Sequence, residues 1–119
     1  MSASTVAMIG ALVDAHRELT PVLAEHLKDM EGEILPHLVM ADIVRWLAIR
    51  VESEESFCKA VLDWLELEFS RGPEDVQGLI SVSCVEMIPD PGQPGSRLRD
   101  LLGPNLKAMD SWSVASPDG

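Results

Sequence analysis

The sequence predicts an all-α protein, a single compact bundle of six or seven antiparallel helices around a buried central helix at about residues 37–51. Apolar residues recur at three- and four-residue spacing along most of the chain, and no segment sustains the alternation of a half-buried strand. Gly-Pro pairs and a Pro/Gly-rich segment separate these stretches. With 119 residues, 46% of them hydrophobic, the chain is long enough for one core, so we assign residues 1–119 to one helical domain.

The predicted central helix reads HLVMADIVRWLAIRV. One face of its helical wheel is apolar, with Met40, Val44, Leu47, Ala48 and Val51. The roughly opposite face is apolar too, with Val39, Trp46 and Ile49. A helix that is apolar on both sides belongs inside a fold, so the other elements are expected to pack around it.

Two helices are predicted before the central one. Ser4 or Thr5 caps the first, which runs to about residue 19. Its expected inner face comprises Val6, Ile9, Leu12, Val13 and Leu19. Thr20 and Pro21 begin the second, which runs to about residue 30 and ends at Gly32. Its expected inner face comprises Val22, Leu23, Leu27 and Met30.

The remaining helices are predicted at about residues 54–71, 73–87, 96–102 and 105–112. Ser53 and Ser96 are the expected N-caps of the first and third of these. The expected core stripe of the first is Phe57, Ala60, Val61, Trp64 and Leu65, and that of the second is Val76, Leu79, Ile80, Cys84 and Met87. Residues 89–96 form a loop. The ordered part is expected to span about residues 5–112, followed by a disordered C-terminal tail.

The net charge and the lack of a targeting signal limit the partners and the cellular location that the sequence favours. The formal net charge is −11, from 20 acidic and 9 basic residues. Such a surface repels phosphate, which argues against nucleic acid and anionic membranes as partners. It suits either a cationic partner or simple solubility. The first residues lack the pattern of a secretory signal and no run of about 20 apolar residues exists, so we expect a cytoplasmic protein.

No catalytic, cofactor-binding or metal-binding site is predicted, and we expect no enzymatic activity. The histidines His16, His26 and His37 fall on three different predicted helices without HxxxH spacing, which favours structural roles. The sequence contains neither a Gly-rich phosphate loop nor a GxSxG turn. Cys58 and Cys84 are expected to be small buried apolar residues and not a disulfide.

Acidic residues form two groups that are candidates for partner binding. Residues 52–75 hold eight acids opposed only by Lys59 and Arg71, and a second group comprises Glu25, Asp29, Glu31 and Glu33. An ordinary solvated face remains an alternative to a site for a cationic partner. The candidate contact residues lie along one face of the fourth helix and at its ends: Glu52, Glu55, Asp63, Glu66, Glu74 and Asp75.

Two further expectations concern the helix surfaces. Glu68 falls near the middle of the fourth helix's apolar stripe, so it should escape at the helix end or pair with an arginine such as Arg45 or Arg50. If Val39, Trp46 and Ile49, or Val85 on the fifth helix, are left uncovered, they would form an apolar patch for self-association.

Three stretches together resemble a known group of proteins. They are Leu35-Pro36-His37 leading to Asp42 and Trp46, the run PEDVQGLISVSCVEMI at 73–88, and LRDLLGPNLK at 98–107. This pattern, covering about residues 10–107, is similar to small acidic all-helical bacterial domains, some of which look like immunity proteins of polymorphic or contact-dependent toxin systems.

The resemblance implies an immunity protein that neutralises a cognate toxin by binding it. Nuclease toxins are commonly basic, and opposite charge speeds the association of two proteins. The alternative is a non-catalytic helical adaptor or scaffold that mediates protein–protein interaction. A toxin gene next to the gene for this chain would favour the first reading, and its absence would favour the second.

Overall fold

The computed structural model describes residues 3–112 and is all-α, as predicted. Within that range there are six α-helices, three short 3-10 helices and no strand. In chain order the elements are α1 (Ala3–Ala15), η1 (Arg17–Leu19), α2 (Thr20–Asp29), α3 (Pro36–Arg50), α4 (Glu55–Arg71), α5 (Glu74–Ser83), η2 (Val85–Met87), η3 (Ser96–Leu101) and α6 (Pro104–Met109). Residues 1–2 and the predicted C-terminal tail, residues 113–119, lie outside the described residues.

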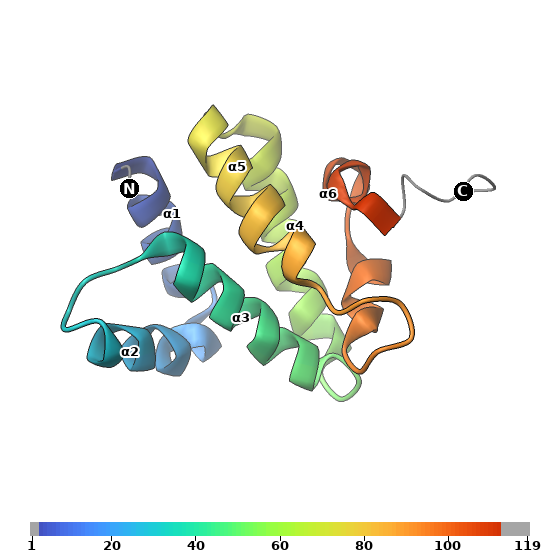
Figure 1. Ribbon diagram of the computed structural model, residues 1–119, viewed down its shortest axis with the longest axis horizontal. Coiled ribbons are helices and arrows are strands. Elements are labelled where there is room, and N and C mark those ends of the chain that lie inside the picture. The colour runs from blue at the N-terminus through green and yellow to red at the C-terminus, as the bar shows by residue number, and fades with distance from the viewer. Residues whose placement is uncertain (1–2, 113–119) are drawn as a thin grey trace.

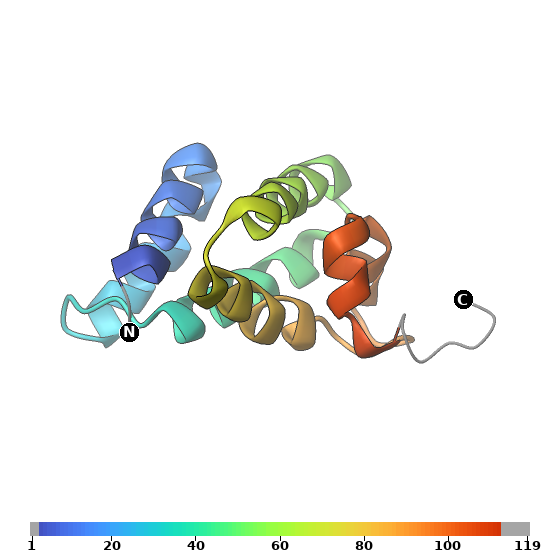
Figure 2. The same ribbon diagram turned by 90° about the horizontal axis from the view of Figure 1, so that it is seen from above.

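The central position of α3 is confirmed. It packs against α1, α2, α4, α5, η2 and η3 (Figures 1 and 2). The fully enclosed side chains of α3 include Met40, Val44 and Leu47 from one predicted face and Val39 from the other, together with Ile43, which neither predicted face included. The enclosure is incomplete, however, because Ile49 is 80% exposed and Leu38 is 48% exposed. The apolar pattern therefore located the most buried helix correctly but overstated how far its outer side is covered.

Helix starts depend on proline and glycine more than on the serines expected as caps. Proline occupies the first turn of α2, α3 and α6, where its missing N–H costs no helical hydrogen bond. The N-cap of α4 is Glu54, and the N-cap of η3 is Gly95, so the predictions for Ser53 and Ser96 were wrong. Gly95 has φ +88°, and a Cβ there would lie 2.6 Å from the Cβ of Ala48 on α3. Glycine is thus required where the loop crosses the central helix.

The fifth helix ends earlier than predicted, which reverses two burial expectations. α5 stops at Ser83, and the chain continues as the 3-10 helix η2. A 3-10 helix has about 3.0 residues per turn instead of about 3.6, so the side chains after Ser83 rotate away from the α-helical wheel. Val85 is therefore only 2% exposed, whereas Met87 is 41% exposed.

Other inward assignments hold for some positions and fail for others. Ile9, Leu12, Val13 and Leu19 are buried as expected. On α4, Val61 and Leu65 are buried, whereas Phe57 and Trp64 are half-buried and Ala60 is exposed. On α2, all four predicted inner residues are only half-buried. α2 lies at the edge of the bundle (Figure 1), so it covers the core without being enclosed.

The C-terminal elements are fastened to the bundle by an almost buried ion pair. Arg99, in η3, pairs with Asp110, which follows α6, and their side chains are 11% and 3% exposed. The Arg99 guanidinium also donates to the carbonyl oxygens of Pro89, at 2.9 Å, and Ile88, at 3.3 Å. The Arg99 side chain thus joins three segments: the loop after η2, the helix η3 and the end of α6.

None of the described helices has both the length and the apolar character needed to cross a membrane.

Candidate partner-binding surface

The six carboxylates predicted to form the binding surface have different environments. Glu55 pairs with Arg97 of η3, whose Nε donates to Glu55 Oε1 at 2.8 Å. This hydrogen bond, with the charge of Glu55, raises the pKa of Arg97. Asp63 pairs with Lys59 one turn earlier on α4, with 2.6 Å between Lys59 Nζ and Asp63 Oδ1. Both pairs are about half exposed, so a partner could compete for them.

Glu66 has a role inside the fold. Its two carboxylate oxygens accept the backbone N–H groups of Asn105 and Leu106, each at 3.0 Å, at the start of α6. These N–H groups have no partner within the helix, so the carboxylate of α4 caps α6 from outside. A Cβ at Gly103 would lie 2.7 Å from Glu66 Cδ, so glycine leaves room for this contact.

The other three predicted carboxylates lie at helix ends. Glu52 is exposed in the turn between α3 and α4, and Glu74 and Asp75 are exposed in the first turn of α5. Asp75 Oδ1 accepts the N–H of Val76 at 2.9 Å. The structure therefore does not present the six carboxylates as one row of equally free groups.

Glu68 is partly buried and pairs with an arginine, as one of the two alternatives expected, although not with Arg45 or Arg50. Its Oε1 lies 3.1 Å from the Nη2 of Arg71 on the same helix. Arg45 pairs instead with Asp42, and Arg50 with Glu54 at 3.7 Å. Glu68 is thus paired with Arg71 near the end of α4, where its side chain stays 23% exposed, so the outcome combines the two alternatives.

A groove between α2 and α3, here called the acidic groove, brings part of the second acidic group to an aromatic wall. It has a volume of about 360 Å³ and is lined by Pro21, Val22, Glu25, Asp29, Asp42 and Trp46. Trp46 is half-buried, packs edge-on against Phe57 at 5.7 Å between ring centroids, and has the Arg50 guanidinium 3.8 Å from its own centroid. The acids of α2 were predicted as a group, but their proximity to Asp42 was not, because it depends on the packing of α2 on α3.

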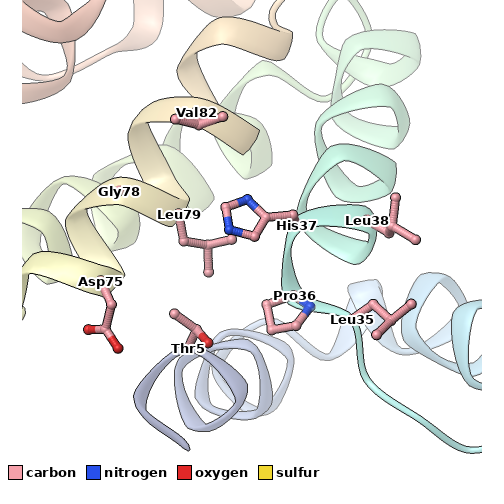
Figure 3. A pocket seen from close by; sticks show the side chains of 9 residues that line it. All are labelled: Thr5, Leu35, Pro36, His37, Leu38, Asp75, Gly78, Leu79 and Val82. Atoms are coloured by element: carbon pink, nitrogen blue, oxygen red, sulfur yellow. The ribbon is translucent and has the colours of Figure 1, made fainter. Parts of the chain in front are cut away.

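A second and larger groove, here called the apolar groove, lies between the start of α3 and α5 (Figure 3). Its volume is about 600 Å³. α1 contributes Thr5, residues 35–38 come from the start of α3, and α5 contributes Asp75, Gly78, Leu79 and Val82. Leu38 and Val82 are 48% and 50% exposed. The only sequence feature that points to this groove is Gly78, a glycine in the middle of a predicted helix.

An apolar patch for self-association was expected only if Val39, Trp46, Ile49 or Val85 were left uncovered, and most of these side chains are covered. Val39 is enclosed, Val85 is 2% exposed, and Trp46 packs against Phe57. Of the side chains proposed for it, only Ile49 is strongly exposed. Trp46 is covered by Phe57 of α4, a different element of the chain, which a wheel of one helix cannot show.

Two histidines join neighbouring elements. His26 is buried on α2, and its Nε2 accepts the N–H of Leu35 at 3.0 Å, which fixes the loop before α3. His37 Nδ1 shares a hydrogen bond with the Oγ of Ser83, which is buried and ties the start of α3 to the end of α5. His16 packs edge-on against Phe57 and Trp64. Among the described residues, no three His, Cys, Asp or Glu side chains gather in a metal-binding arrangement.

The two cysteines are buried free thiols. Burial raises the pKa of Cys58 from 9.0 to about 11, with the charge of Glu54 adding to the rise and that of Arg50 opposing it. Burial alone raises the pKa of Cys84 to about 12. The Cys58 thiol donates weakly to the Leu47 carbonyl oxygen, at 3.6 Å. Both thiols therefore stay protonated near neutral pH, which suits packing and not nucleophilic attack.

The fold and its two grooves can be set beside known proteins. Neither the curated proteins nor the solved structures contain a match to this chain. A family model described as "Domain of unknown function (DUF7674)" matches residues 9–114, which include α2 to α6 and both grooves apart from Thr5. The chain therefore belongs to the DUF7674 family.

Proposed function

We propose that the protein binds a cationic protein partner through its acidic surface, without chemistry of its own. In the specific form of this proposal, it is a cytoplasmic bacterial immunity protein that binds and neutralises a cognate toxin, of a basic, nuclease type. The net charge of −11 supports a cationic partner, because opposite charge accelerates encounter and suppresses wrong pairings. The specific form also draws on the resemblance of three sequence stretches to immunity proteins.

The acidic groove is the observation that carries the proposal. Glu25 and Asp29 stand one turn apart on α2, where like charges repel, and Asp42 faces the same groove from α3. Among the described residues, Asp42 has an ion-pair partner, Arg45, and Glu25 and Asp29 have none. A lysine or arginine from outside would relieve the repulsion, and the Trp46 ring and Val22 would shield it from water.

The six predicted carboxylates on α4 and at its ends, here called the α4 surface, could bind the same partner, but they are expected to contribute unequally. Glu52, Glu74 and Asp75 are exposed and can meet a cation directly. Glu55 and Asp63 would have to exchange Arg97 and Lys59 for a partner's cation, so their net contribution should be small. Glu66 already caps α6, so we expect its loss to disturb the fold before it disturbs binding.

A double charge reversal with a matched control tests the acidic groove. The test variant is Glu25→Lys with Asp29→Lys, and the control is Glu31→Lys with Glu33→Lys, exposed in the neighbouring loop and outside the groove. Both change the net charge equally, so both should slow association with the toxin domain encoded beside the gene. Only the groove variant should also raise the dissociation rate, by about tenfold or more, because it removes a desolvated contact.

The possible results test the location of the binding site and the immunity function separately. Equal dissociation rates for both variants would remove the acidic groove as the site, and the α4 surface would be next to test. Co-expression with the neighbouring toxin domain tests the immunity function, since the wild-type chain should restore growth. Failure to protect cells would contradict that specific function and leave the helical adaptor as the alternative.

A further inference from the structure

Gly78 is a glycine that the fold itself does not need. It lies in the middle of α5, where glycine destabilises a helix relative to alanine. A Cβ at Gly78 would meet nothing within 4 Å, whereas at Gly95 and Gly103 it would collide with neighbouring side chains. Gly78 lines the apolar groove, so the missing side chain widens that groove.

The rest of the apolar groove is suited to an apolar occupant. Leu38 and Val82, each about half exposed, stand on α3 and α5, and the buried Leu79 lies on α5 beside His37 (Figure 3). Exposed apolar side chains that gather around a groove are typical of a binding surface. His37 also lines the groove, but its Nδ1 is already engaged by Ser83.

Charge indicates which occupant fits. Asp75, in the first turn of α5, is the only Asp, Glu, Lys or Arg among the lining residues, and Glu74 beside it is exposed. An apolar segment that carries a lysine or arginine would pair with this end of the groove. A second copy of this chain is disfavoured, because each copy brings a net charge of −11.

We infer that the apolar groove binds an amphipathic helix of the cationic partner. Apolar side chains of that helix contact Leu38 and Val82, its backbone passes close to Gly78, and a basic residue pairs with Asp75. Helix walls favour a helical guest, since the described residues contain no sheet edge to which an extended peptide could add. This inference rests on the proposed function, because it assigns a second contact to the same cationic partner.

The direct test uses two synthetic peptides and nuclear magnetic resonance. One is an amphipathic helical peptide of leucine and lysine, and the other has glutamate in place of every lysine. The lysine peptide should shift the amide signal of Gly78 and the methyl signals of Leu38 and Val82. It should also bind about tenfold more tightly than the glutamate peptide. Equal binding of both peptides, or shifts confined to other surfaces, would overturn the inference.

Filling the groove provides the matched variant. Gly78→Leu should block the lysine peptide, whereas Gly10→Leu, at a mid-helix glycine of α1 that also has open space and does not line the groove, should leave binding unchanged. Both should fold, since neither new side chain meets a neighbour at its Cβ. As a second pair, Val82→Glu should weaken the peptide and Leu67→Glu, on α4 and 52% exposed, should not. Unchanged peptide binding by Gly78→Leu would contradict the inference.

The same variants distinguish failure of this inference from failure of the proposed function. If the toxin domain binds Gly78→Leu as tightly as wild type while still responding to Glu25→Lys with Asp29→Lys, only the inference fails. If the toxin domain does not bind at all but the lysine peptide enters the groove, the proposed function fails and the groove retains its helix-binding property. Sedimentation that shows a dimer abolished by Gly78→Leu would identify a second copy as the occupant and overturn the inference.

Discussion

At the scale of single residues, the position of a carboxylate on a helix does not establish its role. Asp63 and Glu66 lie three residues apart on the predicted outer face of α4, yet one forms an exposed pair with Lys59 and the other caps α6. The difference comes from α6, which packs on α4 about forty residues later in the chain. A charge on this face is therefore a binding candidate only where no later element uses it.

We predict that Glu66→Ala lowers the free energy of unfolding by about 1–2 kcal/mol, because two N–H groups at the start of α6 lose their acceptor. Asp63→Ala is the control, and it should change stability by less than about 0.5 kcal/mol, since its ion pair with Lys59 is exposed. Urea melts of both variants provide the measurement. Equal losses would show that the capping contact does not contribute to stability.

At the scale of elements, α3 organises the fold because its apolar positions exceed what one face of a surface helix needs. Its enclosed side chains face neighbours on several sides, and the loop glycine Gly95 passes directly over Ala48. The uncovered large apolar positions, Leu38 and Ile49, lie near the two ends of the helix. The apolar side chains in the middle of α3 are thus mostly covered, whereas the charged Arg45 there is exposed.

We predict that Leu47→Ala destabilises the protein by about 2–5 kcal/mol, the range for a buried leucine replaced by alanine. Ile49→Ala, two residues later, should change stability by less than about 0.5 kcal/mol because the isoleucine is 80% exposed. Trp46→Ala should fall between them, since Trp46 is half-buried. Thermal or denaturant melts test the order, and a large loss for Ile49→Ala would indicate a covering partner in solution.

At the scale of the whole molecule, net charge opposes the compact state. The chain carries 20 acids and 9 bases, within a body of 46 × 32 × 21 Å. At low salt the screening length is about 30 Å, so most of these charges act on one another, and at physiological salt it is about 8 Å. The ion pairs on the surface offset this repulsion only in part, because the acids outnumber the bases.

We therefore predict that the melting temperature rises when NaCl is increased from about 10 mM to about 300 mM, because screening weakens repulsion among the excess carboxylates. Differential scanning calorimetry at the two salt concentrations measures the shift. The groove variant Glu25→Lys with Asp29→Lys, with less net charge, should show a smaller rise. A fall in melting temperature with salt would mean that the exposed ion pairs outweigh the repulsion.

The helical class, the approximate helix ranges, the central position of α3 and the excess of acidic residues could all be predicted from the amino-acid sequence, because they follow from local spacing and composition. Which groups remain available to a partner depends instead on how the helices pack. This packing covers Val85, engages Glu66 with α6, and brings Asp42 to Glu25 and Asp29. A helical wheel gives a side chain's direction about its own axis, whereas these outcomes depend on which distant element packs there.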